Sequence, residues 1–176
     1  MAKLKFFVPA ILFAVLVGFF LVGLNLKPGE IDSPFIGKQA PGLDLPALSN
    51  PGMRVTRADM LGGYSLLNVW GTWCPGCREE HEALLAIAAN YGVPIYGLNW
   101  KDDPVKAIQW LEQLGDPYVA VGVDQLGNTA IDWGVYGAPE TFLIAPDGTV
   151  LHKRIGPMSL AIWRDEFLPL IQGGAG

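Results

Sequence analysis

The amino-acid sequence predicts an α/β sandwich that follows one long apolar segment. Apolar, strand-like runs alternate with amphipathic, helix-like runs over residues 64–170, which is typical of a sheet covered by helices. The two cysteines of the chain, Cys74 and Cys77, lie at the junction between a predicted strand and a predicted helix. The apolar segment, residues 6–24, contains nineteen uncharged residues.

The segment 6–24 is predicted to be a transmembrane anchor. At about 1.5 Å per residue it spans roughly 28 Å, the thickness of a bilayer core. Lys3 and Lys5 precede it and favour a cytoplasmic N-terminus, which puts the rest of the chain across the membrane. A cleaved signal peptide is the alternative, but its apolar region is usually about 7–15 residues long. This run is longer and no A-x-A-like cleavage site follows it.

The predicted organisation is a cytoplasmic N-terminus at 1–5, a Pro- and Gly-rich linker at 25–35 and a soluble domain at 36–172. The net charge is −5 and no basic cluster is visible, which argues against nucleic-acid binding. Beyond the membrane the domain works in an oxidising compartment. A domain of about 140 residues builds a core without disulfide staples, so the two cysteines are available for chemistry.

The first elements of the domain are short strands or loops at 44–48 and 53–58. The first strong strand is 64–70, a continuous apolar run. The helix after it begins at Pro75, because proline suits the first helical position, where a missing N–H costs nothing. Tyr91-Gly92 ends this helix.

A second buried strand is predicted at 93–100. Residues 102–104 then supply an N-cap and a proline, which open a helix that Gly115 closes. A third strand is expected at 118–123, and a short helix follows it at 128–133.

The turn 146–149 (Pro-Asp-Gly-Thr) joins strands 141–145 and 150–155 into an antiparallel hairpin. Ser159 caps a last amphipathic helix. The whole order is that of a thioredoxin-like sandwich with an extra helix and strand inserted at about 104–123.

A Cys-x-x-Cys pair at a strand-to-helix junction is typical of a thiol–disulfide exchange site. Cys74 lies at the predicted helix N-terminus, where free N–H groups and the helix dipole lower a thiol pKa, so it is the predicted nucleophile. Cys77 lies one turn deeper and is placed to attack the mixed disulfide and release the product.

Other roles for the pair are weaker. A purely structural disulfide would close a tiny loop and add little stability. A metal site could recruit His81, but two thiolates and one imidazole make an incomplete ligand set, so no metal is predicted. Haem attachment needs a histidine directly after Cys77, and Arg78 stands there.

The second notable segment is 134–142, Gly-Val-Tyr-Gly-Ala-Pro-Glu-Thr-Phe. Pro139 precedes a buried strand, which suits a cis peptide in a tight turn; an ordinary trans proline at a loop end is the alternative. In a thioredoxin-like fold this turn faces the cysteines and can pair with an extended peptide. We expect Trp73 to be exposed as part of an apolar rim and Trp70 to be packed inside.

Acidic residues gather in the same region: Glu79 and Glu80 follow Cys77, and Glu140 follows Pro139. Negative charge near a thiolate raises the thiol pKa and makes the dithiol more reducing. Alternatively, Glu79, Glu80 and Glu82 only occupy the solvated first turns of a helix, where the dipole favours acidic residues.

In residues 68–81 (Asn-Val-Trp-Gly-Thr-Trp-Cys-Pro-x-Cys-Arg-x-Glu-His), 99–103 and above all 134–142, the chain resembles the membrane-anchored thioredoxin-like CcmG/DsbE proteins of bacterial cytochrome c maturation. The resemblance implies an inner-membrane protein with a periplasmic domain. Such a protein keeps the Cys-x-x-Cys-His thiols of apocytochrome c reduced, directly or through a partner thiol protein. A DsbD/CcdA-type membrane reductase recharges it, and no cofactor beyond its own disulfide is implied.

By the same resemblance Glu80 and Glu140 match the acidic active-site positions and Pro139 the cis-proline. Gly76 is a departure, because a bulkier residue is more common between the cysteines, and this leaves the redox potential open.

Two other functions remain open from the sequence. One is a TlpA-like reductase for copper-site assembly in cytochrome oxidase. The other is a metal or haem chaperone that binds through Cys74, Cys77 and His81.

Overall fold

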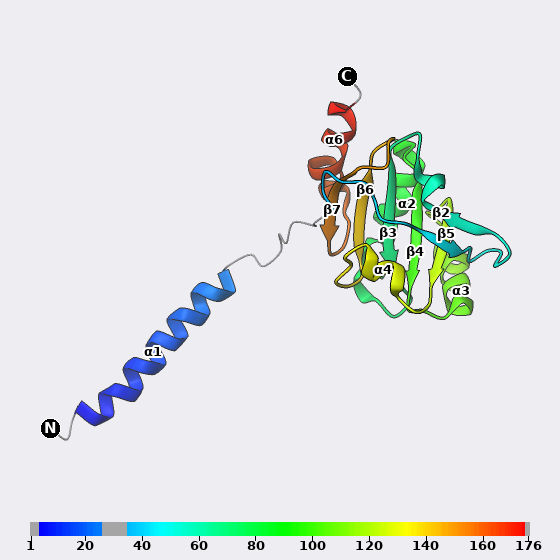
Figure 1. The fold of residues 1–176 in the computed structure, drawn as a ribbon. Coiled ribbons are helices and arrows are strands. Elements are labelled where there is room, and N and C mark those ends of the chain that lie inside the picture. The colour runs from blue at the N-terminus through cyan, green and yellow to red at the C-terminus, as the bar shows by residue number, and fades with distance from the viewer. Residues whose placement is uncertain (1–3, 26–34, 175–176) are drawn as a thin grey trace. The chain divides into compact units, whose positions relative to one another are not determined.

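The computed structural model describes the backbone of residues 4–25 and 35–174, and the side chains of 8–21 and 35–174. The chain divides into two compact units, one up to residue 31 and one from residue 32 onwards (Figure 1).

The first unit contains the helix α1 (Leu4–Asn25). Among the described residues, no helix combines the length and the apolar character needed to cross a membrane. The transmembrane anchor at 6–24 stays a prediction. The predicted N-terminal segment 1–5 and linker 25–35 lie mostly outside the described residues.

The second unit is built on a five-stranded sheet in the order β5-β4-β3-β6-β7 (Figure 1). β3, β4 and β5 are parallel, whereas β6 and β7 are antiparallel to their neighbours. A separate antiparallel pair is formed by β1 and β2. The strands are β1 (Asp44–Pro46), β2 (Arg54–Thr56), β3 (Ser65–Trp70), β4 (Ile95–Trp100), β5 (Ala120–Asp124), β6 (Glu140–Ile144) and β7 (Val150–Ile155). The predicted α/β sandwich is confirmed, and its extra strand is the edge strand β5.

The helices of this unit also follow the predicted order. They are η1 (Arg57–Met60), α2 (Pro75–Tyr91), α3 (Pro104–Leu114), α4 (Asn128–Asp132), α5 (Leu160–Ile162), η2 (Trp163–Phe167) and α6 (Leu168–Gly173). The predicted last helix is a helical stretch whose middle, η2, is π-helical. In that turn the rings of Trp163 and Phe167 stack on each other and are fully buried.

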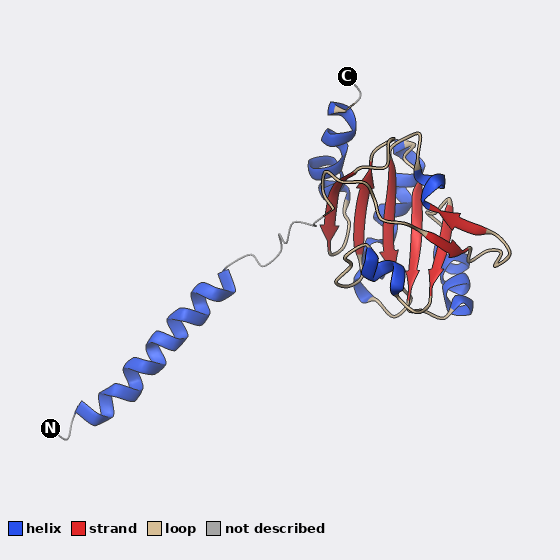
Figure 2. Cartoon of the chain, viewed as in Figure 1, coloured by secondary structure: helices blue, strands red, loops and turns tan. Residues whose placement is uncertain are grey.

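The central strand β3 is buried on both sides, because its side chains alternate between two cores. Leu67 and Val69 face a core that β1, β2, η1 and α4 cover. Leu66 faces the opposite core, which α2 and the C-terminal helices cover (Figure 2). At the end of the strand, Trp70 packs with both cysteines and α3.

The helix α2 begins where the sequence predicts. Cys74 is its N-cap, Pro75 is its first residue, and Gly92 ends it in the left-handed conformation at φ 65°. The two cysteines therefore lie at the carboxyl end of β3, where the chain turns into α2.

Candidate active site

Cys74 and Cys77 form a disulfide, and their Cα atoms are 5.3 Å apart. Both residues are nearly buried, with exposed fractions of 2% and 3%. The backbone N–H of Cys77 donates a hydrogen bond to Cys74 Sγ at 3.1 Å. This contact and the helix N-terminus both stabilise negative charge on that sulfur. The predicted positions of the cysteines are confirmed, and their separate roles as nucleophile and resolving cysteine stay predictions.

The 134–142 segment contacts the disulfide turn, as expected. The Ala138–Pro139 peptide bond is cis, and Ala138 packs against the cluster that holds both cysteines. A Cβ atom added at Gly76 would lie 2.9 Å from Pro139 Cδ. The proline ring and the disulfide turn are thus in close contact, with room for only a glycine between them.

Glu80, one helical turn after Cys77, is fully buried rather than solvated. Its carboxyl accepts hydrogen bonds from Asn68 Nδ2 at 2.8 Å and from the Met158 backbone N–H at 2.7 Å. Burial raises the pKa of Glu80 from 4.5 to about 7, against the opposing effect of these two hydrogen bonds. The sequence signal for this contact is Asn68 itself, a polar residue within the otherwise apolar run of β3, because a polar side chain buried there needs a hydrogen-bond partner.

Asn68 also accepts a hydrogen bond from the Tyr118 hydroxyl at 2.8 Å. Burial, and then the carboxylates of Glu80 and Asp116, raise the pKa of Tyr118 well above its ordinary value. The phenol therefore remains an O–H donor, and its ring stacks on Trp70, with ring centroids 5.4 Å apart. Trp70 is 1% exposed, which confirms the prediction that it is packed.

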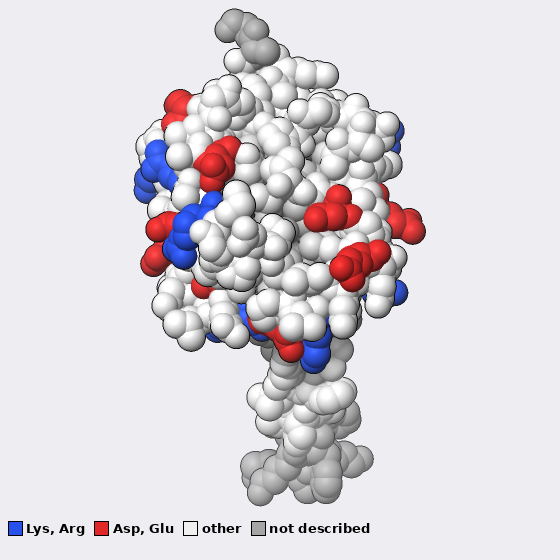
Figure 3. Space-filling model, turned by 90° about the vertical axis from the view of Figure 1, so that its right-hand side faces the viewer, with Lys and Arg blue, Asp and Glu red and all other residues white. Residues whose placement is uncertain are grey.

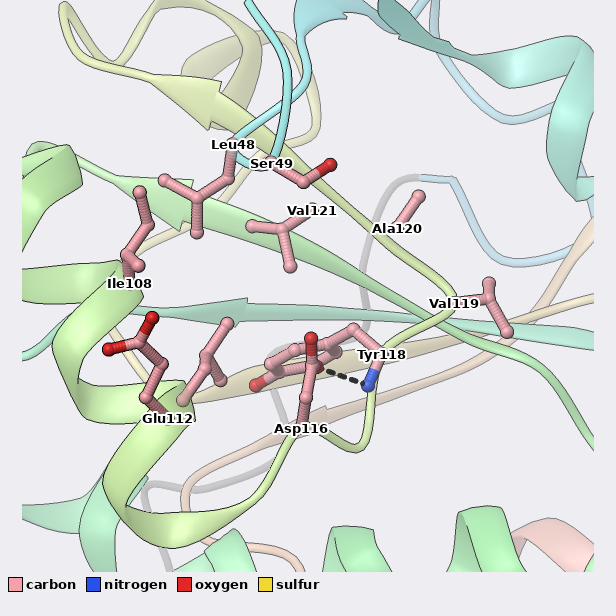
Figure 4. Close-up of a pocket in the computed structure, with 10 residues that line it drawn as sticks. Leu48, Ser49, Ile108, Glu112, Asp116, Tyr118, Val119, Ala120 and Val121 are labelled. Carbon is pink, nitrogen blue, oxygen red and sulfur yellow. Dashed lines mark hydrogen bonds between the residues drawn. The ribbon is translucent and has the colours of Figure 1, made fainter.

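Tyr118 also lines a cavity of about 530 Å³ between α3 and β5 (Figure 4). Leu48 and Val121 contribute apolar surface, and Asp116 accepts a hydrogen bond from the Tyr118 backbone N–H at 2.9 Å. Neither cysteine is among its lining residues, so we assign this cavity no part in the exchange chemistry.

Glu140 is also fully buried, but it has a cation beside it. Lys153 Nζ lies 2.9 Å from Glu140 Oε2 in an ion pair whose side chains are 1% and 0% exposed. The pair is close enough for an ion pair, but its angles are not those of a hydrogen bond. The other carboxylate oxygen accepts hydrogen bonds from the backbone N–H groups of Tyr136 and Gly137. Lys153 carries no distinguishing signal in the sequence, because it lies in a run of three basic residues, 152–154, on a strand.

The turn before Cys74 is tied to the end of β4. Asp102 accepts hydrogen bonds from the backbone N–H and the hydroxyl of Thr72, both at 2.7 Å. Burial acts to raise the pKa of Asp102, but hydrogen bonds from Thr72, Asn99 and Asp103 outweigh it and lower the pKa below its usual range. From the sequence, Asp102 is predicted only as part of a helix start. In the structure the N-cap of that helix is Asp103, and Asp102 instead holds the turn before Cys74.

Trp73 is 49% exposed, which confirms the expected exposure; its part in an apolar rim stays a prediction. Its indole N–H donates to the Trp100 carbonyl at 3.1 Å, and the two rings meet edge to face. Tyr136 is 58% exposed. The turn before Cys74 and the 134–142 segment therefore each carry an accessible aromatic side chain.

Three candidate residues of α2 remain, Glu79, Glu82 and His81. Glu79 and Glu82 are exposed. His81 is 5% exposed, its Nε2 lies 3.0 Å from the Gly115 carbonyl, and its ring packs edge to face on Trp110. Among the described residues, no group of three or more His, Cys, Asp or Glu side chains is placed to hold a metal ion.

Charged side chains are dispersed on the surface shown in Figure 3. Acidic and basic residues are interspersed among uncharged ones there, and the view shows no continuous basic patch. A nucleic acid would need clustered basic side chains, which this face does not offer.

Comparisons with known proteins agree with this geometry. The Redoxin family model matches residues 35–165. The thiol:disulfide interchange protein DsbE of Pseudomonas aeruginosa is 46% identical over 93% of this chain and 91% of that protein. The DsbE protein of Allochromatium vinosum is 43% identical over 95% of this chain and 94% of that protein.

Solved structures show the same fold. A candidate DsbE thiol:disulfide interchange protein of Chlorobium tepidum has 28% identity and a TM-score of 0.66, over 80% of this chain and 96% of that one. A secreted thiol-disulfide isomerase of Corynebacterium glutamicum has 24% identity and a TM-score of 0.68, over 76% and 86% of the two chains. The second likeness supports the fold alone.

The buried carboxyl of Glu80 predicts how stability depends on pH. The pKa of Glu80 is about 7 in the folded protein, whereas its ordinary value, which applies to the unfolded chain, is 4.5. Between these two pH values the folded state holds a proton that the unfolded state has released. The contribution of Glu80 is fully present below about pH 4.5 and falls by about 3 kcal/mol as pH rises through 7. Urea unfolding of the oxidised protein at pH 5 and pH 8 measures most of this loss, because a small part of it occurs below pH 5. Glu80→Gln should remove it, and an equal loss in the variant would contradict the assignment.

The environment of Cys74 predicts the order of alkylation in the reduced protein. The sulfur of Cys74 accepts a hydrogen bond from the Cys77 N–H and lies at the N-terminus of α2. Its thiol should therefore have a lower pKa than the thiol of Cys77. Iodoacetamide near neutral pH should label Cys74 first, as read by peptide mass spectrometry. Faster labelling of Cys77 would reverse the predicted roles.

Proposed function

From its membership of the DsbE family of thiol:disulfide interchange proteins, and hence its thiol–disulfide oxidoreductase activity, we propose a specific role for this chain. It works as a reductant in cytochrome c maturation. Its client is the Cys-x-x-Cys-His segment of apocytochrome c, or a partner thiol protein that acts on that segment. The observation that carries the proposal is the packing of the 134–142 segment against the disulfide turn.

The reaction transfers two electrons from this protein to its client. In the reduced state the Cys74 thiolate attacks one sulfur of the client disulfide, forms a mixed disulfide and releases one client thiolate. The Cys77 thiolate then attacks Cys74 Sγ, which re-forms the Cys74–Cys77 disulfide and releases the second client thiolate. A DsbD/CcdA-type membrane reductase returns the two electrons.

The direction of this transfer is supported by the buried acid of α2, Glu80. At neutral pH part of the Glu80 population is ionised, since its pKa is about 7. A carboxylate so close in sequence to Cys77, within a buried site, opposes a second negative charge on a thiolate. The reduced form is then less favoured, which corresponds to a more reducing dithiol.

The cellular location in this proposal is the periplasmic side of the inner membrane. Residues 6–24 serve as the anchor, and Lys3 and Lys5 remain on the cytoplasmic side. The support is the length of the apolar run and the absence of charge within it. In that position the exchange domain meets apocytochromes before haem is attached.

A variant that lacks the resolving thiol should trap the client. Cys77→Ser leaves Cys74 able to form a mixed disulfide but removes the thiol that resolves it. We expect a Cys74-linked complex with an apocytochrome c or a partner thiol protein, identified by non-reducing electrophoresis and mass spectrometry.

Cys74→Ser is the matched control and should form no such complex. Capture of a copper-site assembly protein of cytochrome oxidase would favour the TlpA-like alternative. Capture of unrelated secreted proteins alone would point to general disulfide formation and contradict the proposal.

The redox potential should depend on Glu80. Glu80→Gln removes the charge that opposes the thiolate, so the potential should become less negative, by on the order of 30 mV for each unit by which the thiol pKa falls. Equilibration with a glutathione buffer measures it. Glu82→Gln, an exposed change on the same helix, should leave the potential unchanged. A strongly oxidising wild-type potential would contradict the reductant assignment.

A further inference from the structure

A buried lysine supports the loop that faces the disulfide. The Lys153 side chain is 1% exposed, and a lysine is rarely buried this completely unless its charge is paired. It belongs to β7, directly opposite Phe142 of β6. Glu140 lies two residues earlier on β6 and is therefore its diagonal neighbour on the same sheet face.

The ammonium group of Lys153 contacts three groups of the 134–140 segment and also lies over the ring of Phe142, 5.2 Å from its centroid. It lies 2.9 Å from Glu140 Oε2 and donates a hydrogen bond to the Gly134 carbonyl at 2.7 Å. It also lies over the ring of Tyr136, 4.5 Å from the centroid, where a cation is attracted by the face of the ring. One side chain thus connects the first residue of the loop, its exposed aromatic residue and the strand after it.

Glu140 completes the arrangement from the other side. While Oε2 faces Lys153, Oε1 accepts hydrogen bonds from the backbone N–H groups of Tyr136 at 2.8 Å and Gly137 at 3.2 Å. Together the two side chains hold the loop backbone at positions 134, 136 and 137. The next residues, Ala138 and Pro139, contact the disulfide turn.

We propose that Lys153 is a positioning residue for the exchange reaction. Its ammonium group, placed between Glu140, the Gly134 carbonyl and the Tyr136 ring, holds the 134–139 loop in the form that receives a substrate polypeptide next to Cys74. Lys153 touches neither the disulfide nor the substrate and acts through the loop. The proposal rests on the exchange activity of the family and not on which protein is the client.

The proposal predicts a loss that depends on the size of the substrate. A polypeptide needs the loop, whereas a small disulfide needs only access to the Cys74 thiolate. For Lys153→Met, reduction of a peptide with an internal Cys-x-x-Cys disulfide should slow about tenfold, while reduction of 2-hydroxyethyl disulfide should change less than twofold. Lys38→Met is the matched control, because Lys38 is exposed and its loss changes the net charge equally.

A second variant separates positioning from stability. Lys153→Met alone leaves the Glu140 carboxylate buried without its cation, which is strongly destabilising. In the double variant Lys153→Met/Glu140→Gln no charge is left unpaired, so the thermal midpoint should recover. Peptide reduction should remain slow, because the Gly134 carbonyl and the Tyr136 ring still lack their cation.

The measurements are stopped-flow rates for both substrates and thermal unfolding of each variant. Recovery of the peptide rate together with stability in the double variant would reduce Lys153 to a structural counter-ion and overturn the proposal. Equal slowing of both substrates in a folded variant would overturn it as well. If Lys153→Met does not fold, the double variant alone gives the comparison.

Discussion

Two acidic side chains are fully buried in the elements that form the site, Glu80 in α2 and Glu140 at the start of β6, and the difference between them is the presence of a cation. Glu140 has Lys153 within 2.9 Å. Glu80 has only neutral hydrogen-bond donors, from Asn68 and Met158. Burying a carboxylate without a cation disfavours its charged form, so the pKa of Glu80 rises to about 7. The same type of residue thus has a raised pKa at position 80 and forms an ion pair at position 140.

This division explains how the site can be rigid and still respond to charge. The tied elements are the loop at 134–139 and the turn before Cys74, which Asp102 holds through Thr72. The first is held by the Lys153–Glu140 ion pair at β6 and β7, and the second by the Asp102 carboxylate just after β4. The group with the raised pKa, Glu80, belongs to α2 itself, one helical turn after Cys77. Geometry and electrostatics are therefore controlled by different side chains.

The parts of the site that follow local rules could be predicted from the sequence. The strand–turn–helix around Cys74, the exposed Trp73 and the cis proline all depend on neighbouring residues or on the resemblance to a family. The long-range ion pair and hydrogen bonds that hold the loop and the turn could not be predicted in this way. Lys153 and Asp102 find their partners 13–30 residues away along the chain, and no periodic pattern marks such a pair. The burial of Glu80 likewise depends on Met158, a distant residue that closes over the helix.

Gly76 shows how the two sides of the site depend on each other. From the sequence, a glycine between the cysteines suggests a looser turn. In the structure its φ is not in the left-handed region, so the backbone does not require glycine. A Cβ atom there would lie 2.9 Å from Pro139 Cδ and 3.2 Å from Pro157 Cγ. Since heavy atoms cannot approach so closely without a shift, any side chain at 76 would push the proline loop that Lys153 holds. Gly76 therefore provides room rather than flexibility, and in this chain the disulfide turn and the loop pack as closely as they do because position 76 has no side chain.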